Sequence, residues 1–354
     1  MQPTKPHFQI LDGLRGWAAL LVVIFHLFEG HFLEPKIIPE HHGYLAVDFF
    51  FMLSGYVVGY AYDDRWGTMS RWDFFKIRLV RLHPMLALGV LIGGIMFFFD
   101  PLGKWMEHTP IWRFLLTLII GLTVLPSPDL RGWGETHTLN GPAWTLMQEY
   151  IANIFYAFLP KKKSIPWLVT IVLIGAAALI KTATWWGGVG TGWSYETFWI
   201  AFVRMVFPFF MGLLMFRLGW KIRVPFAFPI AAALLAILFW MPWFEPKSAN
   251  GLFEAACIIL VFPVIVAIGA GGQVSGAWQR ICKFSGDISY PIYIIHYPFI
   301  YLYTEWNFGA KPTDGQVLLV ASGLFLFFIL LAYGALKFYD EPVRTKLKKR
   351  FLNG

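Results

Sequence analysis

Long apolar runs separated by short polar segments recur along nearly the whole chain. A helix needs about 20 residues to cross a bilayer, and ten runs come close to that length: 11–31, 44–62, 83–99, 142–159, 167–180, 197–216, 225–243, 252–269, 288–304 and 316–337. No long polar insertion divides them, so we expect one membrane domain over residues 1–354. The pattern predicts an all-α polytopic membrane protein with about ten transmembrane helices.

An eleventh apolar stretch, at 111–125, is interrupted by Arg113 and is short for a crossing helix. If it does not cross, most of the 29 Lys and Arg residues fall on one side of the membrane. Basic loops stay in the cytoplasm. We therefore predict cytoplasmic N- and C-termini and a short re-entrant or surface helix near 111–125 on the outer side. The surrounding outer segment, 100–141, is long enough to cover a site that opens outward.

The composition supports a membrane protein and narrows the function. The chain is 57% hydrophobic and 14% charged, whereas soluble domains are about 25% charged. The net charge of +8 marks orientation in the membrane, so no nucleic-acid partner is expected. Cys257 and Cys282 lie in or beside apolar runs and are expected to be reduced thiols without function. One outer group of potential metal ligands has no usual metal spacing, so no metal site is predicted; it comprises His31, Glu34, Glu40, His41 and His42.

The first apolar run contains two ionisable residues on one face. Arg15 and His26 are eleven positions apart, which is within ~20° of three whole helical turns and roughly 16 Å along the axis. We expect Arg15 near the cytoplasmic surface and His26 in the outer half of the apolar layer, both facing one water-accessible cavity. The alternative is an arginine that reaches the headgroups and a hydrogen-bonded core histidine.

Further ionisable residues lie within or beside later runs. Asp48, Glu149, Arg204 and His296 would each cost about 2.5–3.5 kcal/mol near the centre of a span if left charged and unpaired. They must therefore pair, line water or take part in function. The alternative to a functional role is a set of structural ion pairs between helices.

A cytoplasmic segment before the third run mixes cations with aromatic residues. Arg78 and Arg81 are three positions apart and share a face if the segment is helical, so their guanidinium groups would form a fork for phosphate. On charge alone, an anchor for lipid headgroups is the competing interpretation.

Six short motifs follow one another between Leu11 and Pro342. They are Leu11-Asp12-Gly13-Leu14-Arg15-Gly16 with His26; Val47-Asp48 with Ser54-Gly55-Tyr56; Arg78-Leu79-Val80-Arg81-Leu82-His83-Pro84; Trp144-Thr145-Leu146 with Glu149; Ser289-Tyr290-Pro291 with Tyr293 and His296; and Glu341-Pro342. In this order they resemble the signatures of acyltransferase family 3, integral-membrane O-acyltransferases of bacterial surface glycans and of some antibiotics and lipids. The sequence departs from the family's usual residues in having His83 for tyrosine, Thr145 for serine and Tyr150 for a second acid.

The resemblance implies that an acyl group, most often acetyl, moves from cytoplasmic acyl-CoA to a hydroxyl group at the outer face. The protein would then be an O-acetyltransferase of the bacterial cytoplasmic (inner) membrane, surrounded by membrane lipids. Acyl-CoA is a donor substrate in this scheme, and no tightly bound cofactor is implied. The acceptor would be a glycan or another hydroxylated molecule, and the oligomeric state is left open.

The candidate residues divide into three roles in that reaction. His26 would act as general base or as acyl carrier, with Glu149 or Asp48 orienting its other ring nitrogen. The phosphates of acyl-CoA would rest on three cations: Arg15, Arg78 and Arg81. Three further residues would line the passage or contact the acceptor: Trp144, Arg204 and His296.

A function of another class is also compatible with these residues. In a proton-coupled transporter or flippase, His26, Asp48 and Glu149 would form a proton relay. Against it stand the lack of a visible internal repeat and the paired cytoplasmic arginines. A binding or sensing protein without turnover is a third possibility.

Overall fold

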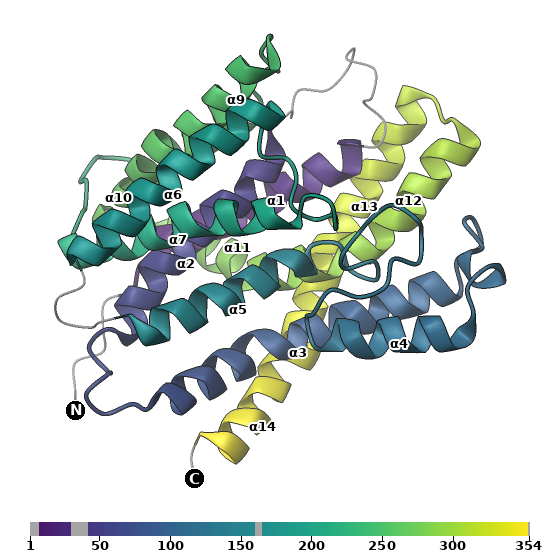
Figure 1. Ribbon diagram of the computed structural model, residues 1–354, viewed down its shortest axis with the longest axis horizontal. Helices are drawn as coiled ribbons and strands as arrows, with labels where there is room; N and C mark the ends of the chain where they lie inside the picture. The colour runs from purple at the N-terminus through teal and green to yellow at the C-terminus, as the bar shows by residue number, and fades with distance from the viewer. Residues whose placement is uncertain (1–6, 30–41, 160–164, 353–354) are drawn as a thin grey trace.

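The computed structural model describes residues 7–29, 42–159 and 165–352, and this part of the chain is mostly helical, without a β-strand. One isolated bridge joins Glu135 to Ser194. Figure 1 shows the helices: α1 Gln9–Glu29, α2 Ala46–Tyr62, α3 Arg71–Phe98, α4 Ile111–Leu122, α5 Ala143–Phe158, α6 Ile165–Trp186, α7 Phe198–Leu218, α8 Ala227–Phe239, α9 Lys247–Ala256, α10 Phe262–Gly271, α11 Gly276–Ile295, α12 Tyr297–Ala310, α13 Asp314–Ala335 and α14 Glu341–Phe351, with 3-10 turns at Gly43–Leu45 and Trp105–Glu107 and π-helical turns at Cys257–Val261 and Leu336–Asp340.

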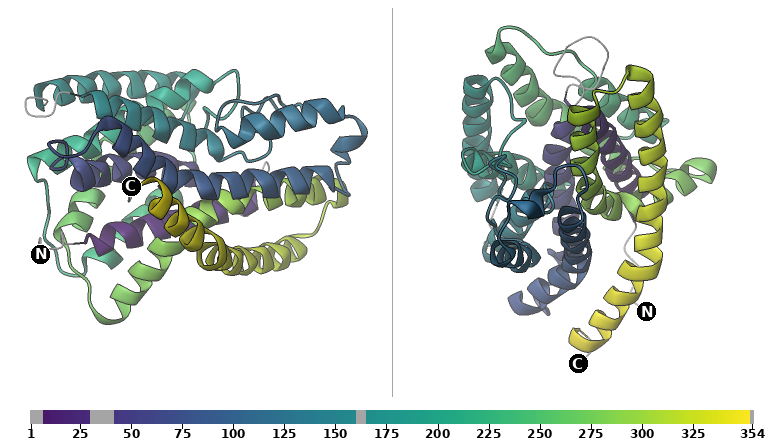
Figure 2. Two further views of the ribbon diagram at one scale, coloured as in Figure 1. Left: turned by 90° about the horizontal axis from the view of Figure 1, so that it is seen from below. Right: turned by 90° about the vertical axis from the view of Figure 1, so that its right-hand side faces the viewer.

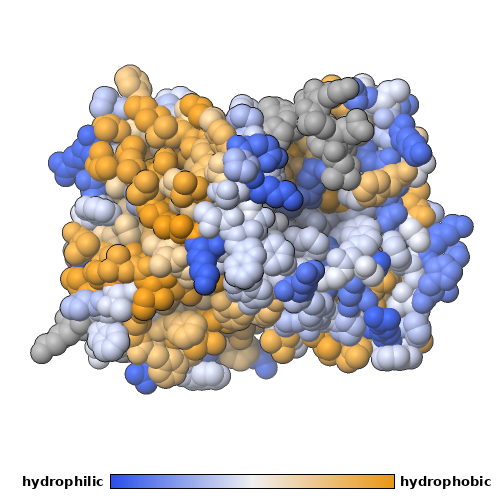
Figure 3. Space-filling model, turned by 45° about the horizontal axis from the view of Figure 1, so that its top comes forward, coloured by the Kyte–Doolittle hydropathy of each residue, from blue (hydrophilic) through white to orange (hydrophobic). Residues whose placement is uncertain are grey.

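The fold is that of an all-α polytopic membrane protein, as predicted. Within the described residues, 7 helices are long and apolar enough to cross a membrane: Gln9–Glu29, Gly43–Tyr62, Arg71–Phe98, Ile165–Trp186, Phe198–Leu218, Lys247–Gly271 and Asp314–Phe351. Large apolar side chains are exposed on many of them, and Figure 3 shows an extensive hydrophobic face beside a more polar one. The total of ten spans and the cytoplasmic termini remain predictions. Helix α4 has 12 residues, which agrees with the short helix expected near 111–125.

The predicted span 288–304 is wrong as a single helix. The structure divides it between α11 and α12, with a bend at His296. Pro298 causes the bend because it has no N–H to offer the carbonyl of Ile294. The amide of Asn140 donates to that carbonyl instead, at 2.9 Å. The loop before α5 thus satisfies the broken helix and is held against His296.

Close helix pairs fix the frame of the protein. Helix α1 packs along α11, and α2 packs along α7. Gly16 on α1 and Gly55 on α2 allow these contacts, since a Cβ atom at either position would collide with the backbone of the partner helix. The approach of α1 to α11 brings Arg15 within hydrogen-bonding reach of α11.

Two long helices are longer than the hydrocarbon layer of a bilayer is thick. Helix α3 has 28 residues and the continuous helix Asp314–Phe351 has 38, about 42 and 57 Å at 1.5 Å per residue, against a hydrocarbon layer of about 30 Å. The start of α3 and the end of α14 lie at the same end of the molecule (Figures 1 and 2). Pro342 explains the π-helical turn Leu336–Asp340 before α14, since its ring cannot continue an ordinary turn.

Candidate active site

A cavity of about 740 Å³ lies between α1, α2, α3, α5, α11 and α14. Its mouth carries charged and exposed side chains, among them His7, Arg81 and Lys348. Its inner end is lined by the buried residues Thr145 and Tyr293. Such a shape suits an elongated ligand with a charged end and a less polar tip.

Arg15 lines this cavity, as expected, and its guanidinium is held by contacts with α11 and with the preceding turn of α1. Its Nε donates to the Ser289 hydroxyl at 2.9 Å and its Nη2 donates to the Gly286 carbonyl at 3.2 Å. Asp12 lies 3.1 Å away and partly neutralises it. Arg15 is therefore a fixed cation whose position depends on the α1–α11 contact.

Arg78 and Arg81 both line the cavity, but they do not form a free fork. Arg78 is buried and makes an ion pair with Glu149 of α5, which also accepts a hydrogen bond from Ser54 of α2 at 2.6 Å. Glu149 therefore connects α2, α3 and α5. Arg81 makes no ion pair within the described residues and is exposed to the cavity.

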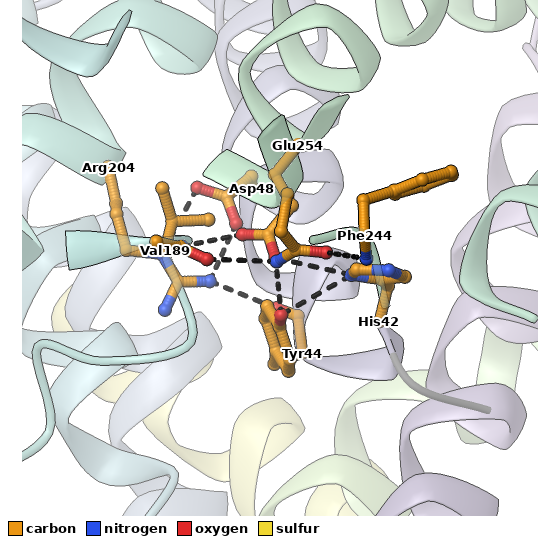
Figure 4. Close-up of polar contacts among 9 residues, drawn as sticks. His42, Tyr44, Asp48, Val189, Arg204, Phe244 and Glu254 are labelled. Atoms are coloured by element: carbon orange, nitrogen blue, oxygen red, sulfur yellow. Dashed lines mark hydrogen bonds and ion pairs between the residues drawn. The ribbon is translucent and has the colours of Figure 1, made fainter. Parts of the chain in front are cut away.

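Asp48 and Arg204 form a separate, fully buried ion pair between α2 and α7. The Asp48 carboxylate accepts hydrogen bonds of 2.6 and 3.2 Å from Arg204, and the remaining guanidinium donors reach the carbonyls of Thr191 and Tyr44. Trp144 covers this pair, its ring centroid 5.4 Å from the guanidinium carbon. All three predicted residues thus belong to one structural contact, and Figure 4 shows Arg204 beside Asp48.

A second buried carboxylate lies next to this pair and was not predicted. Glu254 of α9 accepts hydrogen bonds from the Tyr44 hydroxyl at 2.5 Å, the Asn250 amide at 2.7 Å and the backbone N–H of Val189 at 2.5 Å. His42 lies 3.2 Å from it, and Figure 4 shows the contact between the two side chains. This network ties the 187–197 loop to α9 and to the start of α2.

His26 lies near the C-terminal end of α1, where its Nδ1 is 2.6 Å from the carboxylate of Glu29. The expectation that Glu149 or Asp48 would orient this ring is wrong, because Arg78 and Arg204 already hold those two carboxylates. Glu29 sits one helical turn from His26 and takes that place. Since a carboxylate only accepts, the pair places the proton on Nδ1 and leaves Nε2 as the basic nitrogen.

His296 is brought beside His26, although they are far apart in the sequence. Their ring centroids are 5.4 Å apart, and Tyr297 contacts both rings edge-on. Nδ1 of His296 donates to the Ile292 carbonyl at 2.8 Å. Its buried Nε2 has no hydrogen-bond partner within the described residues. The bend at Pro298 therefore provides a second ring nitrogen that can accept a hydrogen bond.

The cavity does not reach His26. Its inner end stops at Tyr293, whose hydroxyl is 3.0 Å from that of Thr145, and His26 is not among the lining residues. Tyr293 and His296 follow one another toward His26, with ring centroids 6.4 Å apart. The expectation of one cavity shared by Arg15 and His26 is thus wrong for this conformation, because a layer of side chains separates them.

The outer segment folds into the protein beside the two histidines. Glu135 is buried and accepts a hydrogen bond of 2.9 Å from the hydroxyl of Tyr301, whose ring packs against Tyr297. Burial raises the pKa of Glu135 to about 8. The guanidinium of Arg131 lies over the Tyr301 ring at 3.7 Å. Sequence analysis did not single out these residues, because a polar loop carries no sign that it is buried.

No metal-binding group occurs among the described residues. Of the five potential ligands considered from the sequence, only His42 is described, and it contacts Glu254; the other four lie outside the described residues. Cys257 and Cys282 are buried free thiols that are not bonded to one another.

Comparisons with known proteins agree with the motifs that build this site. A family model described as an acyltransferase domain matches residues 8–353. Protein 2 in the picA locus of Rhizobium radiobacter is 30% identical over 197 residues, which cover 51% of this chain and 97% of that protein. Acyltransferase MdmB of Streptomyces mycarofaciens is 26% identical over 167 residues, which cover 45% of this chain and 40% of that protein. No solved structure matches the chain. Because the family model includes every helix around the cavity and both histidines, the chain belongs to acyltransferase family 3 and is a membrane acyltransferase.

Proposed function

We propose that the protein transfers an acyl group, most simply acetyl, from acyl-CoA in the cytoplasm to a hydroxyl group of an acceptor at the outer face. The observation that carries the proposal is the arrangement along α1, with Arg15 at a charged cavity mouth and the His26–Glu29 pair at the opposite end. The two ends of one helix would thus serve the two substrates. A glycan or another hydroxylated molecule is the acceptor class, as for the family.

In this proposal His26 is the general base. Its Nε2 takes the proton of the acceptor hydroxyl while the hydroxyl oxygen attacks the thioester carbonyl carbon. The carbon–sulfur bond then breaks, and the leaving thiolate takes the proton from the imidazolium, which yields an ester and free CoA. Glu29 stabilises the imidazolium, the role that the carboxylate has in a hydrolase triad. Nε2 of His296 is placed to accept a hydrogen bond from the acceptor.

The thioester must pass the layer between the cavity and His26. Tyr293 and Thr145 meet at the inner end of the cavity through their hydroxyl groups, and the Tyr293 ring also packs edge-on against Phe50. Rotation of the Tyr293 side chain would join the cavity to His296. We propose that the acyl end of the donor displaces this ring when it binds.

The test is release of CoA from labelled acetyl-CoA by the purified protein in detergent, followed with a thiol reagent. His26→Ala should abolish release, whereas His108→Ala, at an exposed histidine of the outer segment, should leave it unchanged. A transporter, flippase or sensor would release no CoA. Label retained on the protein after rapid gel filtration at neutral pH, and absent from His26→Ala, would show that His26 is an acyl carrier and not a base.

Analysis of cells would then identify the acceptor. Mass spectrometry of envelope glycans and small hydroxylated metabolites should show an acyl modification that is lost with His26→Ala and kept with His108→Ala. An unchanged set of modifications, despite release of CoA in detergent, would contradict transfer to an outer acceptor.

A further inference from the structure

The C-terminal helix α14 forms one wall of the cavity mouth, a position that could not be predicted from its sequence. It packs against α3, and two of its cations, Arg344 and Lys348, line the cavity. Its other exposed cations, such as Lys349 and Arg350, do not line it. The helix therefore presents one basic face to the ligand space and another to the surroundings.

The cations around the mouth differ in how far they are neutralised. Arg15 and Arg78 pair with carboxylates, as described above, and Lys283 pairs with Asp287 at 2.7 Å. Arg81 and Lys348, in contrast, make no ion pair within the described residues. They mark the part of the mouth where positive charge is available to a ligand.

Arg344 adds to this positive charge because Asp340 pairs with only one of its guanidinium nitrogens. One terminal nitrogen donates to the Asp340 carboxylate at 2.9 Å, while its Nε is buried without a hydrogen-bond partner within the described residues. The charges of Arg344, Arg15 and Arg78 are close enough to Arg81 to repel it. A cluster of like charges at the edge of a low-dielectric region is stabilised by a bound polyanion.

We infer that α14 completes the donor site, with Lys348 and Arg344 binding phosphate groups of acyl-CoA together with Arg81. The inference rests on the proposed function and adds a determinant of donor specificity to it. Because the helix Asp314–Phe351 is longer than the hydrocarbon layer and Lys348 is exposed near its end, these side chains can hold a charged nucleotide in water while the thioester arm enters the cavity. The protein should then prefer acyl-CoA to an acyl-pantetheine that lacks phosphates.

The kinetic test compares matched substitutions on the two faces of α14. Lys348→Gln and Arg344→Gln should each raise the KM for acetyl-CoA about tenfold, the effect of losing one charged hydrogen bond worth about 1.4 kcal/mol, with kcat unchanged. Their KM for acetyl-pantetheine should stay at the wild-type value. Lys349→Gln and Arg350→Gln remove the same charges from the same helix outside the cavity and should change neither constant. Equal effects on the two faces, or no change in KM with the cavity-facing variants, would overturn the inference.

Direct binding separates this inference from the proposed function. Equilibrium dialysis of labelled CoA against the full-length protein, in a neutral detergent free of anionic lipid, needs no turnover. Weaker binding by Lys348→Gln than by Lys349→Gln supports the α14 site even if the wild-type protein releases no CoA from acetyl-CoA. Equal binding by the two variants refutes the α14 site while leaving acyl transfer intact. A wild-type protein that binds no CoA refutes both.

Discussion

The buried pair Asp48–Arg204 tests whether these two residues stabilise the fold or take part in the reaction, because the sequence predicted a role in the reaction for both. Arg204 is 1% exposed and Asp48 is 0% exposed. Removing one partner of such a pair strands a charge in the interior and costs about 3–5 kcal/mol. We therefore expect Asp48→Asn or Arg204→Gln to lower the free energy of unfolding by about 4 kcal/mol. With an unfolding entropy of roughly 2 cal/mol/K per residue, that cost corresponds to a fall in Tm of about 5 °C.

The double variant should be more stable than either single variant. Asp48→Asn with Arg204→Gln removes both charges and leaves two amides that can bond to one another and to one of the two backbone carbonyls that Arg204 now satisfies. The other carbonyl loses its partner at a cost of about 1–2 kcal/mol. The expected coupling between the two positions is therefore several kcal/mol, since two independent losses would add to about 8 kcal/mol.

Thermal unfolding in detergent, followed by tryptophan fluorescence, measures these effects, and CoA release measures function at a temperature where all variants are folded. The double variant should regain most of the Tm and release CoA at a rate near that of the wild-type protein. A double variant that is stable but inactive would refute the structural assignment, because Asp48 would then act on the substrates. Additive losses of stability would refute the ion-pair argument itself.

Three further predictions follow from the site. A cysteine introduced by His26→Cys should react slowly with a thiol reagent added from the cytoplasmic side. After Tyr293→Ala it should react at least tenfold faster, about the effect of 1.4 kcal/mol, whereas Ser54→Cys, inside the cavity, should react at the same rate in both backgrounds. Equal rates for His26→Cys with and without Tyr293→Ala would disprove the closed layer. Glu29→Gln should lower kcat about 100-fold at unchanged KM for acetyl-CoA, and an unaltered kcat would exclude Glu29 as the partner of the base. The pKa of Glu135 is raised from 4.5 to about 8, so between pH 4.5 and pH 8 the folded state keeps a proton that the unfolded state loses. The free energy of unfolding should therefore fall by up to about 1.4 kcal/mol per pH unit in this range. Glu135→Gln should remove this slope in a pH series of unfolding curves, and a slope that persists in the variant would contradict the assignment to Glu135.

Helical periodicity and hydrophobic run length predicted most of the fold correctly. The run at 142–159 became α5, and Arg15 and His26 lie on one helix toward opposite ends, because both features depend on local geometry. The break at His296 was not predicted because a continuous apolar run does not show at which proline the helix will be interrupted. Pro298 bends the chain only where the loop carrying Asn140 supplies the replacement donor, and that contact joins residues 154 positions apart.

Pairing between charged residues was harder to predict than their presence. The sequence shows that Asp48, Glu149 and Arg204 are too costly to leave unpaired in a membrane, but it contains no information on which partner each finds. Partner choice depends on how α2, α5 and α7 are rotated against one another, which no local pattern specifies. Glu29 was overlooked for the opposite reason, since a carboxylate at the end of a span costs little and attracts no attention.

The separation between the cavity and His26 would be a physical advantage for the proposed transfer across a membrane. A continuous water path would leak protons and expose the thioester to hydrolysis near a basic imidazole. In the proposed reaction, with Tyr293 held by Thr145 in the closed position, acyl-CoA would bind by its phosphates at the cytoplasmic end while His26 stays out of contact with cytoplasmic water. The phosphates of acyl-CoA would then contribute equally to binding before and during the reaction. Such an enzyme would discriminate in KM, and not in kcat, against donors that lack the phosphates.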